Sequence, residues 1–181
     1  MFGYKPHADS GWSRARGAGM TGAATVRRGR VEDIAFVMTT ERRPGYDLMV
    51  GRWTEAAHRA ALANPAYAYL IGADGAGQSG GFVILRDLDD PHGNVCLKRI
   101  AGERPGSGFG TALLRLALCW TFSETPAHRV WLDVLADNAR ARHVYVAAGF
   151  VEEGLLRQAY QLPDGGRIDL VLMSILRPNW I

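Results

Sequence analysis

The fold of this chain is decided by residues 95–114, which read VCLKRIAGERPGSGFGTALL. The stretch opens with β-branched and apolar residues from 95 to 100, a pattern typical of a buried strand. Three glycines follow at every second position: Gly106, Gly108 and Gly110. Residues 112–114 and 116–118 then carry apolar side chains that are strong helix formers. The stretch therefore predicts a strand, a glycine loop and a helix, in that order.

A loop of this kind is suited to a phosphate or pyrophosphate. Residues without side chains let backbone N–H groups approach a ligand, and the helix start adds unpaired donors and a positive dipole end. The spacing excludes two common phosphate sites. Thr111 or Leu113 stands where the dinucleotide fingerprint needs its third Gly or Ala, and no lysine follows Gly110 as a P-loop requires. A flexible turn before a helix is the alternative.

A second block, at residues 129–150, provides an independent signal. Residues 129–135 read RVWLDVL and predict a strand. Five spaced residues follow that strand: Asn138, Ala141, Tyr145, Gly149 and Phe150. Together the glycine loop and this block resemble the GNAT superfamily of acetyl-CoA-dependent N-acetyltransferases. In the family's loop motif, Arg/Gln-x-x-Gly-x-Gly/Ala, Pro105 stands where Arg or Gln is usual, and Arg104 comes one place earlier.

The resemblance implies an α/β domain over residues 25–178, with a central mixed, mostly antiparallel sheet flanked by helices. It also implies acetyl-CoA as co-substrate, no metal, and an amine as acceptor. Residues 127–134 and 166–180 look like the RimJ/RimL-type subgroup, which acetylates protein N-termini and some small amines. We therefore expect acetyl transfer to a primary amine, with a protein or peptide N-terminus as acceptor. The alternatives are a small-molecule amine acetyltransferase (polyamine, amino acid or aminoglycoside) and a non-catalytic CoA-binding sensor.

The resemblance also assigns residues to the site. Tyr145 occupies the position of the general acid, since a phenol with a pKa near ~10 stays protonated at neutral pH; aromatic packing is its alternative role. The backbone N–H near Ile100 would polarise the thioester carbonyl. Asn138 would lie near the pantetheine arm, act as a helix N-cap, or both. The expected cofactor-binding residues are Arg99, Ile100, Arg104, Gly106, Ser107, Gly108, Phe109, Gly110, Thr111, Asn138 and Tyr145.

The reaction also needs a base, because an amine is nucleophilic only when neutral. Glu103, just before the loop, is the first candidate, with Glu41 and Asp133 as alternatives. The stretch between the first two predicted helices lines the acceptor site in GNAT folds. Its candidate residues are Glu41, Arg42, Tyr46 and Trp53, and an ordinary solvated or packing role is the alternative for each.

Composition and charge limit the kinds of binding partner that we expect for this chain. The chain has 181 residues, enough for one domain with a proper core, and its 21 basic and 18 acidic residues give a net charge of +3. It has no lysine or arginine run, so we expect no nucleic-acid partner, while an anionic cofactor fits the excess. No stretch is apolar enough for a membrane span. Cys96 and Cys119 are expected to be free thiols in a reducing cytoplasm, and no histidine pair has metal-ligand spacing.

Along the chain, residues 1–24 are expected to form a disordered tail, with Met20 as an alternative start. A first strand from Thr25 ends within residues 27–30, and a helix covers 31–38. A break at residues 41–47 precedes a helix from Thr54, its N-cap, to residue 62. Strands are then expected at 65–71, 80–85, 154–162 and 167–176. Exposed edge strands near the C-terminus favour a homodimer.

Overall fold

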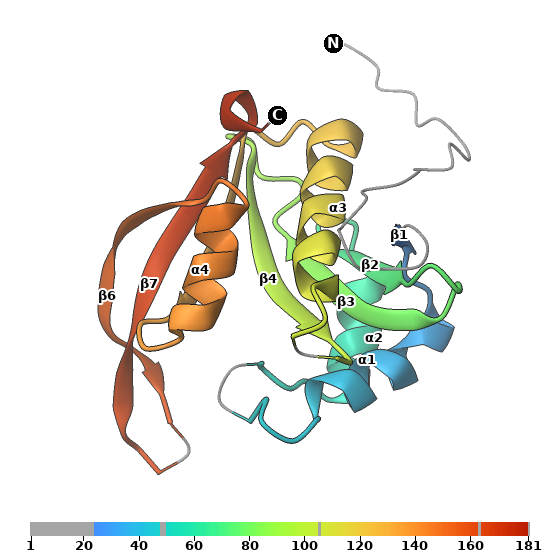
Figure 1. Ribbon diagram of the computed structural model, residues 1–181, viewed down its shortest axis with the longest axis horizontal. Coiled ribbons are helices and arrows are strands. Elements are labelled where there is room, and N and C mark those ends of the chain that lie inside the picture. Colours follow the sequence, from blue (N-terminus) through green and yellow to red (C-terminus); the bar gives the residue numbers. More distant parts are fainter. Residues whose placement is uncertain (1–23, 48–49, 105, 163, 181) are drawn as a thin grey trace.

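The computed structural model describes residues 24–47, 50–104, 106–162 and 164–180. Seven strands in this part of the chain form one sheet in the order β1-β2-β3-β4-β5-β7-β6 (Figure 1). Neighbouring strands are antiparallel except for β4 and β5, which are parallel. This confirms the mixed, mostly antiparallel sheet. The strands are β1 Thr25–Arg28, β2 Ala68–Ala73, β3 Ser79–Arg86, β4 Asn94–Gly102, β5 Arg129–Leu135, β6 Val151–Gln161 and β7 Arg167–Leu176.

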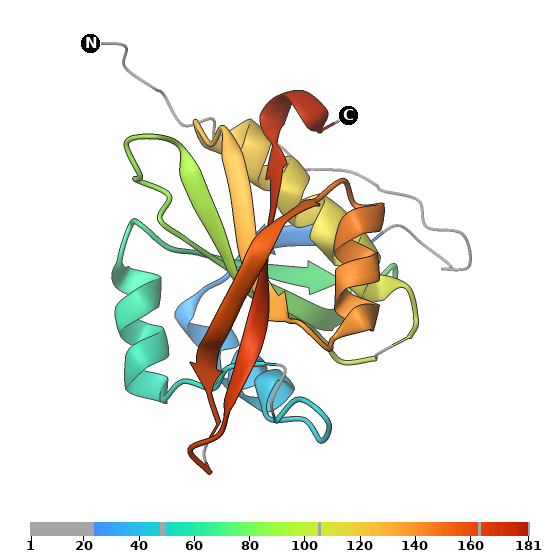
Figure 2. The same cartoon turned by 90° about the vertical axis from the view of Figure 1, so that its left-hand side faces the viewer.

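Helices cover both faces of the sheet, as Figures 1 and 2 show. The helices are α1 Ile34–Glu41, α2 Glu55–Ala63, α3 Phe109–Glu124 and α4 Ala139–Ala147, with short 3-10 turns η1 Val31–Asp33 and η2 Arg177–Asn179. Helices α1 and α2 pack on one face, and α3 and α4 pack on the other. The layered α/β arrangement that the sequence predicts is therefore confirmed.

The two faces of the sheet carry separate hydrophobic cores. Successive residues of a strand point to opposite faces. In β2, Leu70 belongs to the core beneath α3, whereas Tyr69 and Ile71 belong to the core beneath α1 and α2. Five consecutive residues of β2 are accordingly buried. Strand β4 lies between β3 and β5 in the middle of this sheet, and the site is built on it.

Several predicted elements keep their expected bounds. Strand β5 begins and ends where the sequence places it, and so does β7. Thr54 is the N-cap of α2, because its side-chain oxygen accepts a hydrogen bond from the Ala57 N–H at 3.2 Å. The first predicted helix starts as the 3-10 turn η1 and continues as α1. Strand β6 begins at Val151, three residues before its predicted start at Gly154.

Two local predictions are wrong. The break expected from residue 41 starts later, because Glu41 is the last residue of α1 and is fully buried. Helix α3 begins at Phe109, so Phe109 and Gly110 belong to the helix rather than to the loop. The loop ends at Gly108, whose positive φ of 79° marks the reversal into the helix.

The predicted tail and the start at Met20 lie outside the described residues, except for Ala24, which is 2% exposed and sits against the core. Pro105 lies outside them as well. Within the described ranges, no helix combines the length and the apolar character that crossing a bilayer requires.

Candidate active site

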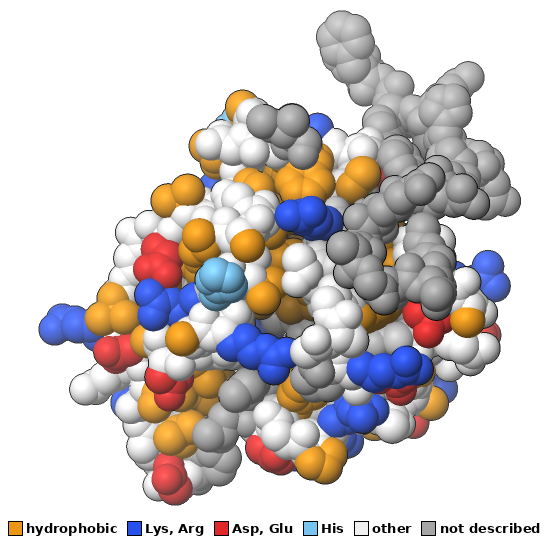
Figure 3. Space-filling view, viewed as in Figure 1, with side chains coloured by type: hydrophobic (Ala, Val, Ile, Leu, Met, Phe, Trp, Pro, Cys, Tyr) orange, Lys and Arg blue, Asp and Glu red, His pale blue; other side chains and the backbone are white. Residues whose placement is uncertain are grey.

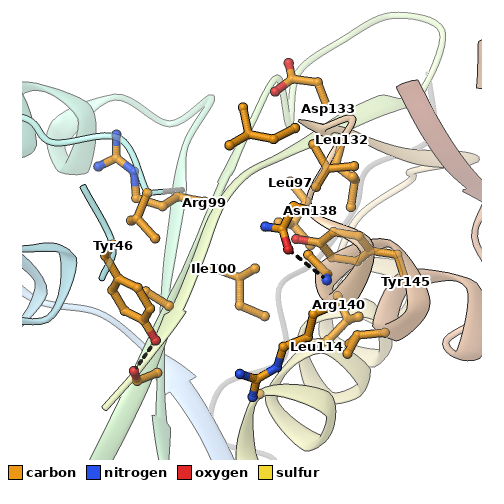
Figure 4. A pocket seen from close by; sticks show the side chains of 18 of the residues that line it. Tyr46, Leu97, Arg99, Ile100, Leu114, Leu132, Asp133, Asn138, Arg140 and Tyr145 are labelled. Carbon is orange, nitrogen blue, oxygen red and sulfur yellow. Dashed lines mark hydrogen bonds between the residues drawn. The ribbon is translucent and has the colours of Figure 1, made fainter. Parts of the chain in front are cut away.

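The site lies where two parallel strands separate. Strands β4 and β5 pair only from Asn94↔Arg129 to Cys96↔Trp131, although β4 continues to Gly102 and β5 to Leu135. The gap between their free ends is a cavity of about 530 Å³. Residues from both faces of the sheet line this cavity (Figure 4). A ligand on one face can therefore meet a ligand on the other face within the sheet.

A β-bulge in β4 determines which side chains reach each face. Leu85 pairs with Leu97, but the next residue back, Ile84, pairs with Arg99, so Lys98 is an extra residue. The bulge changes the alternation of the strand. Leu97 and Ile100 face the core beneath α3, whereas Arg99 lies opposite Ile84, which belongs to the core beneath α1 and α2. The bulge also interrupts the β3–β4 ladder beside the cavity.

On the α3 side, the glycine loop forms a concave backbone edge. Gly106 and Gly108 both have a positive φ, 88° and 79°, and Gly108 is the N-cap of α3. A Cβ on Gly108 or Gly110 would have no neighbouring atom within 4 Å, so the loop backbone is open to a ligand. The helix start supplies unpaired N–H donors and a positive dipole end. The loop can therefore hold an anion.

Basic side chains surround this edge. Arg104 and Arg140 line the cavity, and a Cβ on Gly106 would lie 3.6 Å from Nη2 of Arg140. Figure 3 shows Lys and Arg side chains around the opening between α4 and the loop. The sequence analysis missed Arg140. Its position two residues after the N-cap Asn138 was the available signal, because it brings a cation to the start of α4.

Helix α4 carries the aromatic candidate for acid catalysis. The side chain of its N-cap Asn138 accepts a hydrogen bond from the Ala141 N–H at 3.1 Å, which confirms the capping role. Two turns later, the ring of Tyr145 lies 5.7 Å from the ring of Phe150. Burial and, to a lesser degree, the charge of Asp133 raise the pKa of Tyr145 to about 12. Its phenol keeps its proton at neutral pH.

On the opposite face, the segment between α1 and α2 is fastened to β4. The Tyr46 hydroxyl donates to the Gly102 carbonyl at 2.7 Å, and Nη1 of Arg99 donates to Oε2 of Glu41 at 2.7 Å. The guanidinium of Arg99 lies over the Trp53 ring at 4.7 Å. In Figure 4, Tyr46 and Arg99 lie across β4 from Asn138 and Tyr145.

Glu41 is the centre of a buried polar network. Its Oε1 accepts from Arg42 at 2.6 Å and from the Trp53 N–H at 3.1 Å, and it lies 3.3 Å from Nε2 of His58. Burial by itself would raise the pKa of Glu41. The hydrogen bond to His58, the charge of Arg99 and the Trp53 N–H together lower that pKa below its ordinary value. Glu41 is thus an ionised carboxylate inside the protein.

The structure brings most of the predicted site residues to the cavity wall. These residues are Arg99, Ile100, Arg104, Gly106, Gly108, Gly110, Thr111, Asn138 and Tyr145. Three are elsewhere. Ser107 donates its hydroxyl to the Arg104 carbonyl at 2.8 Å, and Phe109 is 6% exposed in the core beside Gly72 and Gly80. Glu103 faces Arg43, 3.9 Å away.

Of the residues expected to act as the base or to form the acceptor wall, some line the cavity and others do not. Asp133 is the single carboxylate among the described residues that line the cavity, and its side chain is exposed. Tyr46 lines the cavity, while Glu41, Arg42 and Trp53 stand behind that wall. Tyr160, which the sequence analysis did not single out, also lines it from β6. The described residues contain no group of three or more His, Cys, Asp or Glu side chains arranged to bind a metal.

The known proteins that this chain resembles are acetyltransferases. The model of the acetyltransferase (GNAT) family matches residues 34–150. The spermidine N(1)-acetyltransferase of Vibrio cholerae is 35% identical over 82 residues, 45% of this chain and 47% of that protein. A putative ribosomal N-acetyltransferase of Bacillus subtilis, YdaF, is 32% identical over 101 residues, 55% of each chain. The chain spans about half the length of the curated relatives it matches.

Solved structures share the fold over a larger part of the chain. The spermidine N-acetyltransferase of Vibrio cholerae, in a complex with CoA and spermine, superimposes with a TM-score of 0.77 at 24% identity. The match covers 86% of this chain and 96% of that chain. A dodecameric structure of the same enzyme has a TM-score of 0.72 at 25% identity, covering 85% of this chain and 94% of that chain.

Proposed function

Because the chain belongs to the GNAT family of acetyltransferases, we propose that it transfers an acetyl group from acetyl-CoA to a primary amine by direct attack. The observation that supports this most is the cavity between β4 and β5, which reaches both faces of the sheet. The glycine loop lies on one face, and the wall that contains Tyr46 lies on the other. This arrangement suits a reaction between two substrates that approach from opposite sides.

The residues present fit acetyl-CoA, which when bound would supply an activated acetyl thioester. The open backbone of Gly106 and Gly108 and the start of α3 would hold the pyrophosphate, with Arg104 and Arg140 adding positive charge. The apolar side chains of Leu114 and Val144, also in the cavity wall, suit the pantetheine arm. The backbone N–H near Ile100 would polarise the thioester carbonyl beside the bulge.

Proton transfer would involve two side chains. Tyr145 would donate a proton to the departing sulfur, because burial keeps its phenol protonated at neutral pH. Asp133 would accept the amine proton through water, as the lining carboxylate among the described residues. Glu103 is the weaker candidate because it faces Arg43 instead of the cavity.

We further propose a protein or peptide N-terminus as acceptor, in line with the resemblance of residues 127–134 and 166–180 to the RimJ/RimL-type subgroup and with the similarity to the putative ribosomal N-acetyltransferase of Bacillus subtilis. The charge of the cavity supports this choice. Lys98, Arg99, Arg104 and Arg140 line it, and Asp133 is the one carboxylate among the described residues that does so. A polyamine carries several positive charges, and among the described residues this wall offers its further ammonium groups only Asp133 as a partner. Small-molecule amines remain the second candidate, since relatives include a spermidine acetyltransferase.

We also propose that the chain forms a homodimer in the cytoplasm. Strand β6 is the edge of the sheet and is exposed along its whole length. Its apolar residues Val151 and Leu155 are 62% and 53% exposed, as suits a surface that pairs with a second copy. The free thiols of Cys96 and Cys119 suit a reducing compartment. Light scattering of the purified protein measures the oligomeric state.

The first test is the melting temperature with acetyl-CoA, with ATP and NAD as controls. A ligand at about a hundred times its dissociation constant stabilises the folded state by about 2.7 kcal/mol. We expect a shift with acetyl-CoA and none with ATP or NAD. No shift at millimolar acetyl-CoA would contradict the proposed function. With binding established, thiol release in the presence of N-terminal peptides and of spermidine compares the two acceptor classes.

A further inference from the structure

We propose that Arg99 binds the oxygen of a carbonyl or carboxylate group on the α-carbon of the acceptor, so that it selects amines whose α-carbon carries such a group. This inference rests on the proposed function and names its acceptor class: a peptide N-terminus or an amino acid derivative. It also assigns Arg99 to the acceptor, whereas the sequence analysis expected it to bind the cofactor.

Arg99 lies on the face of the sheet that α1 and α2 cover. After the bulge at Lys98, Arg99 pairs with Ile84, whose side chain belongs to the core beneath α1 and α2. Its neighbour Ile100 faces the α3 core. The glycine loop leads into α3, on the far face from the Arg99 guanidinium. The guanidinium therefore stands across the strand from the anion site, while its neighbour in the chain borders the proposed thioester position.

The Arg99 side chain is held on several sides. Arg99 is 4% exposed and donates through Nη1 to Glu41, whose side chain is 0% exposed. The Trp53 ring covers its guanidinium. A Cβ on Gly51 would lie 2.7 Å from Nη2, so the backbone there packs directly on the guanidinium. These contacts fix the plane and direction of the group before any acceptor arrives.

The Arg99 guanidinium also has N–H donors that no described residue uses. A guanidinium has five N–H donors and no acceptor. Among the described residues, the hydrogen bonds of Arg99 involve Nη1 alone. Arg99 nevertheless lines the cavity, next to Tyr46 and Gly51. A nearly buried cation at a cavity wall, with donors that no described residue uses, calls for an oxygen ligand and disfavours a second ammonium group.

The test compares two small acceptors, alaninamide and isopropylamine. Alaninamide carries a carboxamide group on the carbon that bears the amine, and isopropylamine carries a methyl group there instead. The variant is Arg99→Lys, which keeps the positive charge opposite Glu41 but removes the planar fork. We expect kcat/KM for alaninamide to fall about 10- to 100-fold, with a much smaller change for isopropylamine. Calorimetry with the product N-acetylalaninamide should show a parallel loss of affinity.

Arg42→Met is the matched control. Arg42 bonds to the same carboxylate, Glu41, but does not line the cavity. A merely structural effect on the network would change the two acceptors together, as we expect of the control. If Arg99→Lys lowers kcat/KM equally for alaninamide and isopropylamine, the assignment is overturned. A fall confined to alaninamide supports it. If the wild type binds acetyl-CoA but acetylates no amine, the proposed function fails and this assignment fails with it.

Discussion

Replacing Tyr145 by Phe isolates the role of a single hydroxyl. The substitution keeps the ring and its contact with Phe150, whose centroid lies 5.7 Å away. The Tyr145 hydroxyl forms no hydrogen bond with any of the described residues. We therefore expect the free energy of unfolding to change by less than about 1 kcal/mol, because no paired partner is left unsatisfied.

The expected loss is in turnover. A positioned general acid contributes about 10²–10⁴-fold to the rate, which corresponds to about 2.7–5.5 kcal/mol of barrier. Tyr145→Phe should lower kcat by that factor. The KM for acetyl-CoA should change little, because the proposed phosphate site lies at the glycine loop and not at the last turn of α4.

The pH profile gives a second, independent readout. Burial and the Asp133 charge raise the pKa of Tyr145 to about 12, so the phenol stays protonated below that pH. Wild-type turnover should rise with pH as the acceptor amine loses its proton, and should show no descending limb below about pH 10.

The assay is steady-state release of the CoA thiol from pH 6 to 10, with circular dichroism to verify folding of the variant. A variant that retains kcat within twofold of the wild type at neutral pH would refute the assignment of Tyr145 as the acid. So would a wild-type descending limb near pH 8 or 9, since it would place the titrating acid on another group.

Three further predictions concern stability. Phe109→Ala should cost about 3–5 kcal/mol in chemical denaturation because its ring fills the core; a cost below 1 kcal/mol would contradict that placement. Gly108→Ala should lower the free energy of unfolding by about 1–2 kcal/mol, because Gly108 has a positive φ. Gly110→Ala, in the first turn of α3, should leave that free energy unchanged or raise it by up to about 1 kcal/mol. Equal melting temperatures for the two variants would disprove this. The pKa of Glu41 is lowered in the folded state, so its contribution to stability is complete above the unfolded pKa of about 4.3 and is lost as pH falls below it. Glu41→Gln should therefore show a shallower loss of unfolding free energy between about pH 4.5 and 3, and an unchanged slope would remove Glu41 from the acid response.

Local patterns were sufficient for much of the fold. The run 129–135 of β5 alternates apolar residues that fit a half-buried strand, and its bounds are as predicted. Thr54 and Asn138 cap their helices because a short polar side chain reaches the third N–H beyond it. Such contacts depend on neighbours in the chain, so the sequence alone carries them.

The remaining features depend on distant partners. Glu41 is buried because Arg99, 58 residues away, neutralises it, and no local pattern reveals that pair. In a regular strand, Arg99 would lie on the same face of the sheet as Leu97. The bulge at Lys98 places it on the opposite face. Phe109 looks like a loop residue next to glycines, yet Gly72 and Gly80 leave the space that its ring occupies. These placements follow from how strands and helices pack, which single-sequence periodicity does not specify.

The central claim is acetyl transfer from acetyl-CoA to a primary amine at the cavity between β4 and β5. Mass spectrometry of a peptide with a free N-terminus, incubated with the protein and saturating acetyl-CoA, tests it most directly. We predict one acetyl group on the peptide's α-amine, formed with stoichiometric release of CoA and greatly reduced in Tyr145→Phe. Binding of acetyl-CoA without acetylation of this peptide, of alaninamide or of spermidine would contradict the claim.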